Sequence, residues 1–274
     1  MSADALNDVH LVGTDGKGLP CSKTLLASVS PVFMRMFFGD FNERDSNRCS
    51  LDFHSGVIEL IVKYCYCGKL DLIWCMDFTL DEEAYLLAEL REGGRFFELE
   101  DLFADVEARI GNLVFYQEDR KKYQYASAFL VEFFKRGEVE EPLGLALHRF
   151  AVENAMECFG PRALQNGYHH AHPTLLSNVL QETKDTYAIV RCIQAWYYHD
   201  NKSVETNFSD EEKLALVEVA QNIDLKSLSK AELLNVKPCP LFPADRILEA
   251  LVYHVRSSDE AISETPRASR LWYG

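Results

Sequence analysis

The sequence has no surplus of positive charge. Its 274 residues contain 28 lysines and arginines against 43 aspartates and glutamates, which gives a net charge of -15. A chain this acidic is repelled by the phosphates of nucleic acids and by anionic membrane surfaces. The composition therefore argues against nucleic acid and membrane as partners and favours another protein.

Long apolar runs and targeting signals are also absent. No uncharged apolar run approaches the roughly 20 residues that a membrane span needs. The first ten residues, MSADALNDVH, have neither the basic nor the apolar region of a secretory signal. We expect a cytoplasmic or nuclear protein, or both. Its eight cysteines, including Cys65 and Cys67, are then expected to be reduced and to pack as small apolar side chains.

The common catalytic motifs are missing as well. The sequence has neither a G-x-S-x-G elbow nor an H-E-x-x-H helix. The segment GTDGKG is rich in glycine, but Leu19 and Pro20 follow it instead of the Ser or Thr and the helix of a phosphate-binding loop. The sequence therefore predicts no catalytic residue, no cofactor and no enzymatic activity.

A group of histidines, His169, His170 and His172, could suggest a metal site. Neutral imidazoles bind zinc and copper, but no cysteine or carboxylate lies near these histidines at a familiar ligand spacing. A polar loop between helices is the preferred interpretation, and no metal is predicted. A metal-dependent enzyme built on the histidines is the alternative.

The first part of the sequence mixes strand and helix patterns. Apolar residues alternate around a turn at Asp15-Gly16, which predicts a hairpin. Thr79 and Glu82 have the spacing of a capping box at a helix start. Further elements are expected in this order: a short strand at 47–53, a helix at 56–68, a strand at 69–74, and helices beginning near 79 and at 96–111.

Residues 19–38, LPCSKTLLASVSPVFMRMFF, predict two short helices that meet at a corner. Ser30 is a favourable N-cap, and Pro31 suits the first position of a new helix. We expect Leu25, Leu26 and Phe33 to pack in the core. Part of the remaining apolar surface is a candidate for coverage by another chain.

Beyond residue 112 the strand signals stop, and the rest of the sequence predicts helices. The polar segment QEDRKKYQ marks a domain boundary. Capping boxes open two later helices, at Ser209/Glu212 and Ser229/Glu232. We predict four parts of the chain: a first domain at 1–116, a linker at 117–124, a helical domain at 125–256 and a disordered tail at 257–274.

Several of these segments resemble a known family. DVHLV, LPCSKTLLASVSPVFMRMFFGDFNER and CSLDFHSGVIELIVKYCYCGKLDL resemble a BTB/POZ domain, and FFELEDLFADVEARI is similar to the helices that close that fold. LHRFAVENAMECFG, HPTLLSNVLQ and IVRCIQAWYYHD are similar to the BACK domain of Kelch-type ubiquitin ligase adaptors. The resemblance implies an α+β BTB/POZ domain, a small sheet flanked by helices, followed by an all-α BACK-like helical bundle.

The resemblance also implies a function. Relatives form homodimers through the helical corner, which assigns Val29, Val32 and Met36 to a two-fold interface. Adaptors that bind cullin-3 carry a hydrophobic-x-Glu element after the corner, and here Phe41-Asn42-Glu43 stands at that place. The implied protein is a homodimer that binds the cullin-3 scaffold through Phe41 and Glu43 and brings a substrate protein to ubiquitin ligation.

Two departures from the family leave alternatives open. Ser22 stands where the family usually has histidine, and Kelch repeats that would capture a substrate do not follow the BACK-like region. The sequence therefore does not identify the substrate. The alternative function is a BTB-BACK scaffold or nuclear co-regulator that assembles partners without ligase activity, with Phe41 an incidental residue of a surface loop.

Overall fold

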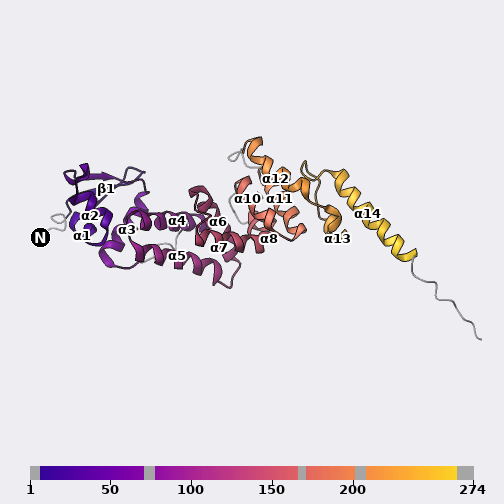
Figure 1. The fold of residues 1–274 in the computed structure, drawn as a ribbon, viewed down its shortest axis with the longest axis horizontal. Helices are drawn as coiled ribbons and strands as arrows, with labels where there is room; N and C mark the ends of the chain where they lie inside the picture. Colours follow the sequence, from indigo (N-terminus) through magenta and orange to yellow (C-terminus); the bar gives the residue numbers. More distant parts are fainter. Residues whose placement is uncertain (1–6, 71–77, 166–170, 201–207, 264–274) are drawn as a thin grey trace, which may run out of the picture. The chain divides into compact units, whose positions relative to one another are not determined.

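The computed structural model describes residues 7–70, 78–165, 171–200 and 208–263. The chain divides into two compact units, Met1–Leu147 and His148–Gly274 (Figure 1). Residues 71–77, which include Cys75 and most of the strand predicted at 69–74, lie outside the described residues.

The sheet of the first unit has three strands in the order β2-β1-β3. The first two strands, β1 (Val9–Val12) and β2 (Gly18–Cys21), are antiparallel, whereas β3 (Arg48–Ser50) runs parallel to β1. Gly16 has a φ of 77°, a left-handed conformation that glycine adopts without steric cost. The predicted hairpin is confirmed.

Helices make up the rest of the first unit. The structure confirms the predicted caps: Ser30 and Thr79 accept hydrogen bonds from the first turns of their helices, and Gly68 ends its helix with a φ of 66°. The helical elements are α1 (Lys23–Val29), α2 (Pro31–Phe38), η2 (Asn42–Arg44), α3 (Ser55–Cys67), α4 (Leu80–Phe96), α5 (Glu100–Phe115), α6 (Lys121–Arg136) and α7 (Pro142–Glu153), which continues into the second unit.

Aromatic rings fill the core between α2 and the end of α4. The ring of Phe33 stacks on those of Phe97 and Phe37, with centroids 4.3 and 5.6 Å apart. Leu26 is fully buried, as predicted, but the prediction for Leu25 is wrong, because 48% of that residue is exposed. Consecutive residues on a helix point about 100° apart, and the side of α1 that packs against the unit carries Leu26 and Ala27 and leaves Leu25 in water.

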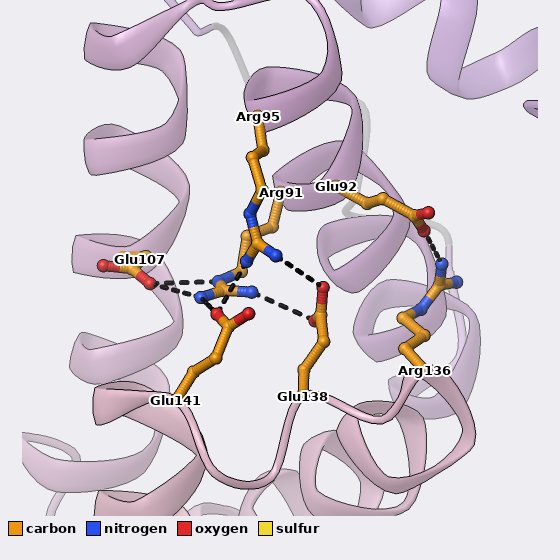
Figure 2. Close-up of polar contacts among 7 residues, drawn as sticks. All are labelled: Arg91, Glu92, Arg95, Glu107, Arg136, Glu138 and Glu141. Carbon is orange, nitrogen blue, oxygen red and sulfur yellow. Dashed lines mark hydrogen bonds and ion pairs between the residues drawn. The ribbon is translucent and has the colours of Figure 1, made fainter.

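Five charged side chains meet where α4, α5 and the α6–α7 turn come together (Figure 2). We call these residues, Arg91, Arg95, Glu107, Glu138 and Glu141, the Arg91 cluster. The guanidinium of Arg91, only 1% exposed, lies 2.7 Å from Glu107, 3.0 Å from Glu138 and 2.5 Å from Glu141. Arg95 pairs with Glu141 at 2.6 Å. Three carboxylates from distant segments therefore converge on one buried cation.

The Arg91 cluster ties α6 and the start of α7 to the first unit. Arg91 also lies between the rings of Phe103 and Phe133, 4.7 and 4.9 Å from their centroids. The hydroxyl of Tyr125 donates a hydrogen bond of 2.5 Å to Glu83 of α4. The polar segment 117–124, predicted as a linker, thus lies within the first compact unit. The physical reason is that the apolar and charged partners of α6 are on α4 and α5.

The second unit is helical, as predicted, with one isolated bridge between Cys239 and Phe242 among its described residues. Ser229 and Glu232 form the predicted capping box, whereas the Glu212 side chain lies outside the described residues. Its elements are α8 (Ala155–Phe159), α9 (Pro161–Gln165), α10 (Pro173–Glu182), α11 (Thr186–Asp200), α12 (Asp210–Asn222), η4 (Leu225–Ser227), α13 (Lys230–Leu233) and α14 (Ala244–Ser263).

The last helix is longer than the sequence indicates. Residues 257–263, the start of the predicted disordered tail, continue α14, because extending an existing helix costs far less than starting one. Residues 264–274 lie outside the described residues. Within the described ranges, every helix is too short or too polar to cross a membrane.

Candidate protein-interaction surface

The helical corner is built around Ser30. Its hydroxyl accepts a hydrogen bond from the Phe33 amide at 3.2 Å and donates one of 2.6 Å to the carbonyl of Phe97. Pro31 occupies the first position of α2, as predicted. Ser30 is completely buried, so the corner is anchored to the end of α4 and its outer side chains are held in fixed directions.

Large apolar side chains cover the outer side of this corner. Phe33 and Phe37 point into the unit, at 0% and 2% exposure. The two helices also carry four exposed residues, which we call the corner face: Leu25 and Val29 on α1 and Met34 and Phe38 on α2, between 42% and 53% exposed. Each pair is four residues apart and so shares one side of its helix, and exposed apolar residues of this kind are typical of a surface that another protein covers.

The corner face coincides only in part with the predicted dimer residues. Val29 belongs to it, whereas Val32 and Met36 are half-buried. The sulfur of Met36 lies 3.4 Å from that of Cys49 in β3, so this side chain packs partly inside its own unit. The sequence interpretation missed Met34 and Phe38, although their spacing of four residues places them on one side of the predicted helix.

Phe41 and Glu43 lie in the η2 turn that follows the corner. Phe41 is the N-cap residue of η2 and is 58% exposed. Glu43 is half-buried, and Asp40 and Asp45 are exposed on either side of the turn. The turn therefore carries an exposed phenyl ring with three carboxylates within four residues of it in the sequence.

The segment before α1 contains Ser22, which stands where the family usually has histidine. The Ser22 amide donates a hydrogen bond of 2.8 Å to the hydroxyl of Tyr66, and the side chain of Ser22 makes no capping bond. The Lys23 amide donates to the carboxylate of Asp8 at 2.7 Å. Asp8 thus serves the start of α1 in place of a side-chain cap from Ser22.

Of the three histidines, only His172 lies among the described residues. Its Nδ1 accepts a hydrogen bond from the Thr174 amide at 3.3 Å, which caps α10. Within the described ranges, no three His, Cys, Asp or Glu side chains gather as metal ligands would. The described part of the histidine group therefore has a structural role in a helix cap.

The cysteines of the first unit are mostly buried. Burial raises the pKa of Cys65 to about 12 and that of Cys49 to about 11, so both thiols stay protonated near neutral pH. Cys67 is exposed, and the prediction that it packs in the core is wrong. Cys67 is the last residue of α3, and its neighbours Tyr66 and Gly68 are exposed as well, so this end of the helix lies at the surface.

The architecture of the first unit, a small sheet closed by helices, defines the class of domain. Residues 1–110 match the BTB/POZ domain family. This part of the chain is therefore a BTB/POZ domain, as predicted, and the helical C-terminal region is consistent with a BACK-like domain.

Two curated relatives match the N-terminal region. Kelch-like protein 38 of Danio rerio is 35% identical over 86 residues, which cover 31% of this chain and 14% of that protein. Kelch-like protein 30 of Homo sapiens is 42% identical over 72 residues, which cover 26% of this chain and 12% of that protein. The matched segments thus span only a small part of either relative.

Proposed function

We propose that this protein is a non-catalytic, homodimeric adaptor that binds the cullin-3 scaffold and brings a substrate protein to ubiquitin ligation in the cytoplasm or nucleus. The observation that carries the proposal is the exposed Phe41 in the η2 turn, directly after the helical corner of a BTB/POZ domain. The match to two Kelch-like proteins supports it.

The chemistry of the turn suits an anchor on a helical partner. A phenyl ring that is 58% exposed can fill a cavity between two helices, and buried aromatic rings are common energetic centres of interfaces. Glu43 beside it can meet a basic side chain or the N-terminus of a helix. Asp40 and Asp45 would steer a basic surface toward the ring.

Dimerisation accounts for the corner face. A monomer would leave large apolar areas in water at four residues, Leu25, Val29, Met34 and Phe38. We assign them to the dimer interface together with the half-buried Val32 and Met36. A specific interface of this kind buries more than about 1,000 Å² in total.

Calorimetry with the purified N-terminal region of the cullin tests the adaptor proposal. The wild-type protein should bind in the nanomolar to low micromolar range. Phe41→Ala should lose about 2 kcal/mol, roughly thirtyfold in affinity, because it removes the proposed anchor. Tyr116→Ala, which truncates another exposed aromatic side chain of the first unit, is the control and should bind normally.

A second function becomes the better one if binding fails. If the wild-type protein gives no heat at tens of micromolar while remaining a folded dimer, the adaptor proposal is wrong. A scaffold or nuclear co-regulator that assembles partners without the cullin would then take its place. The exposed corner face suits this candidate equally, since dimerisation through it does not need the cullin.

Light scattering on the full chain tests the dimer. Phe38→Glu should produce monomers, because a charge in an apolar interface must remain unpaired or become neutral. Phe38 is exposed, so this change leaves the core intact. Met36→Glu should act in the same direction but also disturb the contact with Cys49. A wild-type protein that is monomeric at micromolar concentration would rule out the homodimer.

A further inference from the structure

The side chain of Lys23 reaches from α1 to the η2 turn. Its ammonium group donates hydrogen bonds to the backbone carbonyls of Arg44 at 2.7 Å and Glu43 at 3.3 Å. The two segments are about 20 residues apart in the sequence. One lysine therefore joins the helical corner to the turn that carries Phe41.

The charge of Lys23 does not favour the helix in which it lies. Lys23 is the first residue of α1, where a positive charge opposes the helix dipole. The carboxylate of Asp8 accepts the Lys23 amide at 2.7 Å, and this bond does not involve the ammonium group. The ammonium therefore stabilises the fold through its hydrogen bonds to the η2 turn and not through α1.

The η2 turn itself is held by weak bonds. Its own backbone bonds are long, 3.2 Å from the Arg44 amide to Phe41 and 3.3 Å from the Ser46 amide to Glu43. No side chain caps its start at Phe41. Hydrogen bonds from a charged donor are stronger than neutral ones, so we expect those of Lys23 to hold the end of the turn more firmly than its own backbone bonds.

The lysine side chain is also held in place along its path. Its ammonium lies 5.6 Å from the centroid of the Phe37 ring, which is 2% exposed and rigidly packed in the core. An ammonium beside an aromatic ring is attracted by the ring electrons. The bonds to Glu43 and Arg44 therefore start from a fixed point of the fold and not from a free surface side chain.

We propose that Lys23 is a positioning residue, which orders the η2 turn and thereby fixes the direction in which Phe41 meets its partner. The identity of that partner as a cullin rests on the function proposed above. Lys23 itself need not touch the partner. Its effect on binding passes through the carbonyls of Glu43 and Arg44.

Hydrogen exchange on the full chain tests the ordering of the turn. Lys23→Met keeps an unbranched side chain as far as the fourth atom and removes the charge and the donors of the ammonium group. The amides of Arg44 and Ser46 should then exchange about tenfold faster, since a charged hydrogen bond is lost. Lys23→Arg, which can still donate to carbonyls, should restore slow exchange. Lys17→Met removes the same charge from an exposed site of the hairpin and should change neither amide.

Binding of the cullin N-terminal region tests the consequence. Lys23→Met should weaken binding about tenfold while the protein remains a folded dimer whose melting temperature falls by no more than about 5 °C. Unchanged exchange at Arg44 and Ser46 would overturn the proposal, and so would faster exchange with unchanged affinity. If the wild-type protein does not bind the cullin, the adaptor function fails, and the exchange experiment alone decides whether Lys23 orders the turn.

Discussion

The two units of the chain bury different kinds of polar group. The first unit buries charged side chains, namely Glu83, Glu89, Arg91 and Glu138. Among the described residues of the second unit, the buried polar side chains are uncharged: Ser177, Thr183 and Gln194. The first unit therefore buries charged groups beside its aromatic core, whereas the buried polar groups in the described part of the second unit are neutral.

The buried charges of the first unit favour one arrangement of distant segments over others. A guanidinium has five donors and cannot lose its charge, so it can be buried only where several acceptors meet. Arg91 meets this condition only when Glu107, Glu138 and Glu141 are brought together. A buried charge network adds little net stability but penalises every arrangement in which it is incomplete.

The largest loss of stability should come from removing a buried apolar side chain of the second unit. Trp196 is 4% exposed, and its indole N–H donates to the carbonyl of Ala171 at 3.1 Å. Trp196→Ala should lower the free energy of unfolding of the second unit by about 3–5 kcal/mol, because it removes a buried large aromatic side chain. Calorimetric unfolding of the full chain measures it, with Leu248→Ala, at a residue 56% exposed, as control. An unchanged melt would mean that Trp196 is not a packing residue.

A somewhat smaller loss of stability should follow from removing the buried charge of Arg91 in the first unit. Arg91→Met leaves the buried Glu138 with Arg95 as its remaining partner, 3.5 Å away. The first unit should lose about 3 kcal/mol, at the low end for loss of one partner of a buried ion pair. Arg95→Met, at a side chain 44% exposed, should cost less than about 1 kcal/mol. Equal costs for the two variants would contradict the assigned difference in burial.

The smallest effect should be a change in how the stability of the first unit depends on pH when a glutamate of the Arg91 cluster is replaced. Burial raises the pKa of Glu141, but hydrogen bonds from Arg91 and Arg95 outweigh it, and the pKa ends below its ordinary value of 4.5. Its stabilisation is therefore present above pH 4.5 and is lost as the pH falls through the lowered pKa. Glu141→Gln should make the first unit less sensitive to acid in urea unfolding measured between neutral and acid pH.

Glu138 is the matched variant for this experiment. Burial raises the pKa of Glu138 above 4.5, despite its pairing with Arg91. Its contribution has the opposite sign, since it is present at low pH and is lost as the pH rises through the raised pKa. Glu138→Gln should therefore make the first unit more sensitive to acid. The same slope for both variants would refute the opposite shifts.

Local features of the fold were predictable because short-range chemistry produces them. The caps at Ser30, Thr79 and Ser229 and the turn at Gly16 each depend on residues within a few positions. The predicted domain limits depended on composition alone, and α6 shows the weakness of that signal. Its start is polar in sequence, yet Tyr125 and its neighbours pack into the first unit.

The candidate site was predictable only in outline. Resemblance to the BTB/POZ family pointed to Phe41 and Glu43, and helix periodicity pointed to the corner. Which side of each short helix faces water depends on what packs behind it, so periodicity alone misassigned Leu25 and missed Phe38. No local pattern connects Lys23 with Arg44, because that contact joins segments brought together only by the fold.

The acidic character of the chain and the caps of its helices could be read from composition and from neighbours along the chain, and the BTB/POZ class from a resemblance in sequence. The burial of Arg91 beside glutamates 47 and 50 residues away, the exposure of Phe41 and the bond of Lys23 to the η2 turn could be seen only in the folded chain. These features depend on side chains from distant segments, and their energies exist only once the chain has folded.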